Sequence, residues 1–110
     1  MAVSEKLADR VRTLLATEEG LTEKKMFGGL CFLIHGNMAC GVSSQGLMVR
    51  VGPEAYEACL AEPHAREMDF TGRPMKGFVF VDRPGTSTDA QLKSWLDRGV
   101  KFARGLPAKD

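Results

Sequence analysis

The fold is decided by residues 26–42, which read Met26-Phe27-Gly28-Gly29-Leu30-Cys31-Phe32-Leu33-Ile34-His35-Gly36-Asn37-Met38-Ala39-Cys40-Gly41-Val42. Apolar residues run almost without interruption from Met26 to Ile34, which is typical of a strand covered on both faces. Gly36-Asn37 then supplies a two-residue turn, so the stretch is predicted to be a hairpin. The register that follows pairs His35 with Met38, Leu33 with Cys40 and Cys31 with Val42.

A helix is expected before this hairpin and a third strand after it. Ser4 can cap a helix whose apolar positions form one stripe, namely Leu7, Val11, Leu14 and Leu15. After a reversal at 44–46, residues 47–51 alternate between apolar and other side chains, as in a strand with one buried face. The first half of the chain therefore predicts one helix followed by a three-stranded meander.

The second half predicts another helix, two strands and a last helix. Gly52-Pro53 opens the helix, which Pro63 closes, and the strands lie around 68–70 and at 78–81. Thr88 with Gln91 three residues later forms a capping box for the last helix. The predicted fold class is α+β in the order αβββαββα, with a largely antiparallel five-stranded sheet packed with helices.

Composition limits the kind of protein. The 110 residues suit a single domain, 1–110, with its core at about 5–105. Fifteen basic and fourteen acidic residues give a net charge of +1, so no long-range field attracts nucleic acid or a membrane. The three cysteines form no CxxC pair, and no apolar run reaches the length of a membrane span. We expect a cytoplasmic protein with no membrane partner.

Several short segments form a family-specific pattern: Lys25-Met26-Phe27-Gly28-Gly29, the turn at Gly36 with Met38, Gly41-Val42, residues 47–51, and Gly72-Arg73-Pro74-Met75. On this pattern the chain resembles the TfoX/Sxy amino-terminal domain family. The resemblance implies a two-layer α+β domain, similar to secretion-chaperone-like folds, and it also predicts a homodimer. Longer members regulate natural competence and carry a second, helical domain. The family brings no catalytic residues and no cofactor.

No group of residues in the sequence predicts catalysis or metal binding. Cys31 and His35 lie four residues apart in the predicted strand, which is about 13 Å and too far for two ligands of one zinc ion. Gly28-Gly29 precedes a strand instead of opening a helix, unlike a phosphate loop. We therefore expect no enzyme and no cofactor, although a site built from residues distant in sequence remains as an alternative.

Nucleic-acid binding linked to transcription is another alternative. Five basic residues lie on or next to predicted strands and are the candidate phosphate contacts: Lys24, Lys25, Arg50, Arg73 and Lys76. Base stacking needs exposed aromatic rings, but Phe27, Tyr56, Phe70 and the other aromatic residues are expected to pack in the core. The sequence therefore does not favour nucleic acid as the partner.

The leading hypothesis is a small regulatory domain that binds protein through a sheet edge or a sheet face. A small sheet has edges that a partner can cover. The sequence shows no group of residues that points to catalysis instead. We expect four residues to matter either for the fold or for contact with a partner: Met26, Phe27, Gly28 and Gly29. Glycine in a strand often marks a bulge or the close approach of another chain. The partner itself is not identified by the sequence.

Overall fold

The computed structural model describes residues 5–26, 29–43, 46–69 and 74–107. In chain order the elements are α1 (Glu5–Leu15), β1 (Leu21–Met26), β2 (Gly29–Ile34), β3 (Asn37–Val42), β4 (Gly46–Arg50), α2 (Tyr56–Leu60), β5 (Ala65–Asp69), β6 (Pro74–Asp82), the 3-10 helix η1 (Arg83–Thr86) and α3 (Asp89–Arg104).

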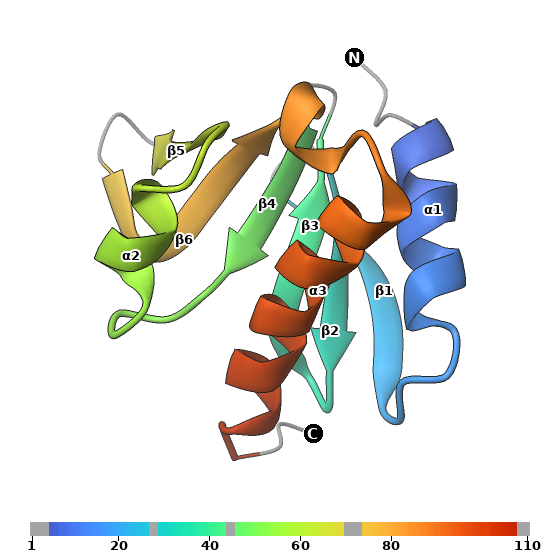
Figure 1. Ribbon diagram of the computed structural model, residues 1–110. Helices are drawn as coiled ribbons and strands as arrows, with labels where there is room; N and C mark the ends of the chain where they lie inside the picture. Colours follow the sequence, from blue (N-terminus) through green and yellow to red (C-terminus); the bar gives the residue numbers. More distant parts are fainter. Residues whose placement is uncertain (1–4, 27–28, 44–45, 70–73, 108–110) are drawn as a thin grey trace.

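The strands form one antiparallel six-stranded sheet in the order β1-β2-β3-β4-β6-β5. Buried residues of α1, α2 and α3 pack in one cluster with alternate residues of the strands, so the three helices cover the same face of the sheet (Figure 1). The predicted α+β class with a largely antiparallel sheet is confirmed. The opposite face, which we call the helix-free face, is not covered by any helix of the described chain.

The prediction of five strands was wrong because the sequence analysis missed β1. This strand pairs with β2 over its whole length, from Leu21 opposite Ile34 to Met26 opposite Gly29. The side chains at 22–25 are exposed, so the strand lacks the apolar alternation by which strands are recognised. Met26 belongs to β1, and the apolar strand that follows starts at Gly29.

The turn between β2 and β3 is His35-Gly36, and the predicted turn at Gly36-Asn37 was wrong. Ile34 pairs with Asn37, and the two turn residues have φ angles of 50° and 84°. Two consecutive positive φ angles are the geometry of a type I′ hairpin turn. Asn37 is only 1% exposed, and its Nδ2 donates a hydrogen bond of 2.9 Å to the carbonyl oxygen of Pro107.

Moving the turn by one residue reverses which side chains face the helices. Phe32 pairs with Cys40 and Cys31 with Gly41, and the register shifts between Phe32 and Leu33. Phe32 and Cys40 therefore lie in the core under the helices, whereas Cys31 and Leu33 point to the helix-free face. The predicted pairs with Leu33 and Cys31 were wrong, since a slip of one residue moves every side chain to the other face.

The second half of the chain follows the predicted order with different bounds. The helix predicted from Pro53 is shorter in the structure, Tyr56–Leu60. Before it, the N–H groups of Val51 and Gly52 both donate to the carbonyl oxygen of Gly77, at 2.8 and 3.0 Å. These bonds hold the segment before the helix against β6. The predicted cap at Ser4, most of the reversal at 44–46 and the segment 70–73 lie outside the described residues.

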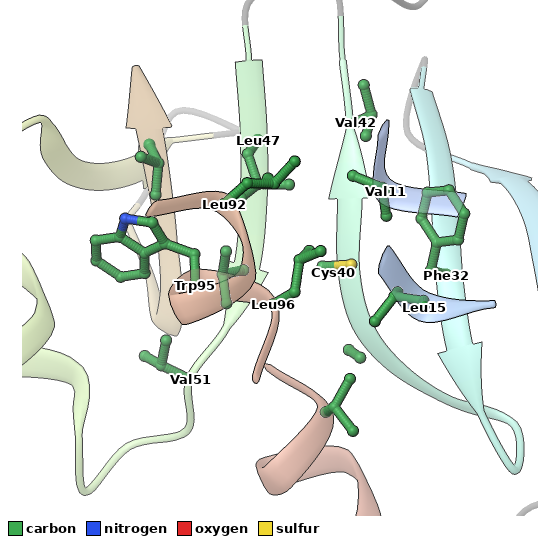
Figure 2. Close-up of a cluster of buried hydrophobic side chains, with 14 of the residues drawn as sticks. Val11, Leu15, Phe32, Cys40, Val42, Leu47, Val51, Leu92, Trp95 and Leu96 are labelled. Atoms are coloured by element: carbon green, nitrogen blue, oxygen red, sulfur yellow. The ribbon is translucent and has the colours of Figure 1, made fainter. Parts of the chain in front are cut away.

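Helix α3 provides the centre of the core. Its capping box is present: the Gln91 N–H donates to Thr88 Oγ1 at 3.1 Å, and the Thr88 N–H donates to Gln91 Oε1 at 3.0 Å. The helix packs on β3 and β4, and Figure 2 shows Leu92, Trp95 and Leu96 pointing into the cluster. Further along the same face Gly99 lies against the backbone of Ala39. Helix α3 therefore covers the middle strands of the sheet on the helix side.

Candidate interaction surfaces

The three cysteines are buried, free and separated by the sheet. Cys40 and Cys59 lie in the helix-side core, and Cys31 lies on the helix-free face. Burial raises the pKa of each thiol, and for Cys59 the nearby Arg98 guanidinium partly opposes that rise. Among the described residues no three His, Cys, Asp or Glu side chains gather as metal ligands. These thiols are therefore packing groups, poorly suited to act as nucleophiles.

We expect the three thiols to be protected in the native protein. With Ellman's reagent at pH 8, they should react at least about tenfold more slowly than in guanidinium chloride, because the thiolate is the reactive form. Since burial raises their pKa, the stability that these thiols contribute is complete below the pKa of an unfolded thiol, about 8.5, and is lost as the pH rises above it. Rapid labelling of one thiol per native chain would contradict this.

Strand β1 forms one free edge of the sheet and positions two of the predicted basic residues. Lys24 pairs with Cys31 and therefore points to the helix-free face, whereas Lys25 pairs with Leu30 and points to the helix side. The neighbouring Glu23 accepts a hydrogen bond of 2.9 Å from Arg12 Nε of α1. The two lysines therefore do not share one surface.

The backbone of β1 presents unpaired groups on its outer side. The His35 N–H donates to the Gly20 carbonyl oxygen at 3.0 Å; Gly20 directly precedes Leu21 and His35 directly follows Ile34, so they form the next pair of the ladder after Leu21–Ile34. Because bonded and non-bonded pairs alternate in an antiparallel ladder, residues 22, 24 and 26 bond inward to β2. The N–H and C=O groups of Leu21, Glu23 and Lys25 then point away from the sheet. Within the described chain no strand lies on that side.

The signature Met26-Phe27-Gly28-Gly29 spans the end of this edge. Met26 and Gly29 are paired in the ladder, and Phe27 and Gly28 lie outside the described residues. A Cβ at Gly29 would come within 2.5 Å of the Val42 carbonyl oxygen, so this glycine permits close contact between β2 and β3. At Gly29 the signature has a packing role inside the sheet.

The helix-free face carries a separate apolar cluster. Met48 on β4 packs with Phe80 on β6, and Phe78 lies against them. The prediction that the aromatic residues are committed to packing therefore holds for the buried Phe80, whereas Phe78 is only partly buried. Sequence alone could not choose between the two faces of β6, because Phe78-Val79-Phe80-Val81 is apolar on both.

Cations lie over both of these rings. The guanidinium carbon of Arg66 on β5 is 4.4 Å from the centroid of the Phe80 ring, and that of Arg50 on β4 is 5.7 Å from that of Phe78. The Arg50 guanidinium is also 5.2 Å from the centroid of the Phe102 ring of α3. Arg50 was predicted from the sequence as a phosphate contact, whereas Arg66 was not, because its place over Phe80 depends on the pairing of β5 with β6.

The predicted phosphate contacts are not gathered into one patch. Lys24 and Arg50 share the helix-free face, but β2 and β3 lie between their strands, which places the two strands about 14 Å apart. Lys25 is on the other side of the sheet. Arg73 and the side chain of Lys76 lie outside what the structure describes. A surface made of the five predicted residues is not supported.

A cleft of about 670 Å³ lies between the segment around α2 and the last turns of α3. Its walls include Val51, Pro53 and Phe102, and its charged groups are Glu54, Glu62, Arg98 and Lys101. Arg98 Nη1 lies 2.7 Å from Glu62 Oε2, and the guanidinium carbon is 4.2 Å from the centroid of the Trp95 ring. Since these cations and carboxylates balance, the cleft favours no charged ligand.

Comparison with protein families gives a match to the TfoX N-terminal domain over residues 13–103. No curated protein and no solved structure matches the chain. None of the described helices is long and apolar enough to span a membrane.

Proposed function

Since the chain belongs to the TfoX N-terminal domain family, which points to a regulatory or interaction domain, we propose that it is a cytoplasmic regulatory domain that pairs with a second copy of itself through β1. The observation that carries the proposal is the row of backbone groups on the outer side of β1, with which no strand of the described residues pairs. Such an edge binds another strand by main-chain hydrogen bonds, and its side chains select the partner.

The two edges of the sheet differ in their suitability for strand pairing. β1 keeps a regular register with β2 over six residues. β5 has five residues, and its register with β6 shifts between Glu67 and Asp69. A bulge of this kind twists an edge away from further pairing. The regular edge at β1 is therefore the better docking strand.

The charges of β1 favour one antiparallel register. In such a pair, residues whose backbone groups point outward must face each other. With the twofold axis at Lys24, Glu23 of each copy faces Lys25 of the other, so two pairs of opposite charge form. An axis at Glu23 would instead place two carboxylates face to face, which is unfavourable. The first register also places the two Lys24 side chains opposite each other, which is unfavourable for the same reason, but of the two registers only this one forms pairs of opposite charge, so it is the proposed contact.

This register can be tested by cross-linking. In Lys24→Cys, made together with Cys31→Ala because Cys31 lies opposite residue 24 in β2, the two introduced thiols would belong to a non-hydrogen-bonded pair, where Cα atoms are about 4.5 Å apart and a disulfide can form. We expect a disulfide-linked dimer under mild oxidation, seen on a non-reducing gel. Lys25→Cys is the matched control, because its thiols would lie on a diagonal about 7–8 Å apart and should stay unlinked.

A second variant tests the edge without a cysteine. Lys25→Pro removes an outward N–H and leaves the bonds to β2 intact, whereas Lys25→Ala removes the charge and keeps the N–H. In light scattering we expect a dimer mass for the wild type and a monomer mass for Lys25→Pro, with Lys25→Ala in between or unchanged. A wild-type mass of one chain at high concentration, or equal cross-linking of both cysteine variants, would show the proposal to be wrong.

A further inference from the structure

The helix-free face has a second feature that the β1 edge does not explain. Phe78 and Phe80 are two residues apart on β6 and project from the same side, while Val79 and Val81 between and after them lie in the helix-side core. Met48 of β4 lies opposite Phe80 and completes an apolar strip. Aromatic rings in alternate positions on an antiparallel sheet face are an arrangement that single-stranded RNA-binding domains use to stack bases.

The sequence of β6 agrees with that use. Residues 76–81 read Lys76-Gly77-Phe78-Val79-Phe80-Val81. The RNP1 motif of such domains reads Lys/Arg-Gly-Phe/Tyr-Gly/Ala-Phe-Val at these positions, followed by any residue and then Phe/Tyr. The chain differs by having Val79 in place of a small residue and Arg83 in place of the last aromatic residue. The likeness is confined to this strand, because the sheet here has six strands and the RNA-binding fold has four.

The charges around the strip suit a phosphate backbone. Arg50 and Arg66 lie beside the two rings, as described above. Among the described side chains that the register places on this face, Asp82 is the carboxylate, and it accepts hydrogen bonds of 3.1 and 3.2 Å from Arg66 Nε. That ion pair is solvent-exposed, so it contributes little, and a phosphate can replace the carboxylate.

We propose that the helix-free face binds single-stranded nucleic acid, with one base stacked on Phe78 and the adjoining phosphates held by Arg50 and Arg66. Phe80 is 6% exposed beneath Arg66, so a second base reaches its ring only when that side chain turns toward a phosphate. Arg66 therefore acts as a movable cover over the second stacking position. This inference goes beyond the proposed function and uses another surface than the β1 edge.

The test measures fluorescence anisotropy of labelled 12-nucleotide RNA and DNA single strands of mixed sequence, and of the matching duplexes, at 50 and 200 mM salt. We expect single strands to bind more tightly than duplexes and affinity to fall as salt rises. The RNA and DNA arms show which sugar the face accepts. No binding of either single strand at 50 mM salt and 100 μM protein, or tighter binding of the duplexes, would overturn the proposal.

Three variants test the assigned residues. Phe78→Leu keeps an apolar side chain in the strip but removes the ring, and it should weaken binding about tenfold, whereas Phe78→Tyr should bind like the wild type. Arg66→Gln should weaken binding and reduce the salt slope by about one. Lys93→Gln, which removes one exposed charge on α3, is the matched control and should bind like the wild type.

Two results with the folded variants contradict the assignment, with folding checked by circular dichroism. One is unchanged affinity of Phe78→Leu for the single strands. The other is a change in the mass of the protein on Phe78→Leu with unchanged affinity, which would identify a second copy of the chain as the occupant of this face. Because the β1 variants are scored by mass and cross-linking, the two proposals succeed or fail separately.

Discussion

Replacement of Phe32 by alanine is expected to lower the free energy of unfolding by about 3–5 kcal/mol, the range observed when a buried aromatic ring is removed. Phe32 is 0% exposed and lies in the core under the helices, between β1 and β3 in the sheet (Figure 2). The loss combines the transfer free energy of the ring with the cost of the cavity that remains. Urea denaturation followed by circular dichroism measures it as a fall in midpoint at constant slope.

The matched control for this change is its neighbour in the strand. Leu33 is only partly buried and points to the helix-free face, so Leu33→Ala should cost clearly less than Phe32→Ala. The register inferred from sequence alone placed Leu33 opposite Cys40, on the same face as the core residue. A larger loss at Leu33 than at Phe32 would therefore show that the observed register is wrong.

Replacement of Gly99 by alanine is expected to destabilise the protein, although in most helices this change stabilises by up to about 1 kcal/mol. A Cβ at this position would collide with the carbonyl oxygen of Ala39, which belongs to the backbone of β3 and cannot rotate away. The helix or the strand must shift, and overpacking of this kind costs about 1–3 kcal/mol, occasionally more. Thermal unfolding should show the loss as a lower Tm.

Ser94→Ala provides the control within the same helix. Ser94 is exposed, and its side-chain contact is a hydrogen bond of 3.4 Å from Arg98, so the variant should stay within about 0.5 kcal/mol of the wild type. If Gly99→Ala were as stable as the wild type or more stable, the close contact of α3 with β3 would be disproved.

The sequence predicted the elements with strong local signals and missed those fixed by tertiary contacts. The last helix was found because Thr88 and Gln91 cap it and its apolar residues recur with helical spacing. β1 was missed because its exposed residues 22–25 make a polar strand that only its pairing with β2 reveals. The turn was misplaced because His35 takes a positive φ, a conformation that is uncommon for residues other than glycine, and the sequence around His35 does not indicate it.

The candidate surfaces, too, depend on tertiary contacts that the sequence does not show. Lys24, Lys25 and Arg50 were found as basic residues, but a list of charges does not say which side of a sheet each one takes. Arg66 and Phe78 matter only as neighbours, and that relation depends on how β5, β6 and β4 are ordered. Faces and edges of a sheet are properties of strand order, which a short sequence motif does not contain.

The position of α3 has a consequence for how the protein is made. This helix comes last among the described elements, yet it packs against β2, β3 and β4 and supplies Leu92, Trp95 and Leu96 to the core. Until the ribosome has released residues 89–104, the middle strands have an apolar face without a cover. Domains fold as units during synthesis, so the nascent chain exposes that surface to chaperones and to aggregation until α3 has emerged.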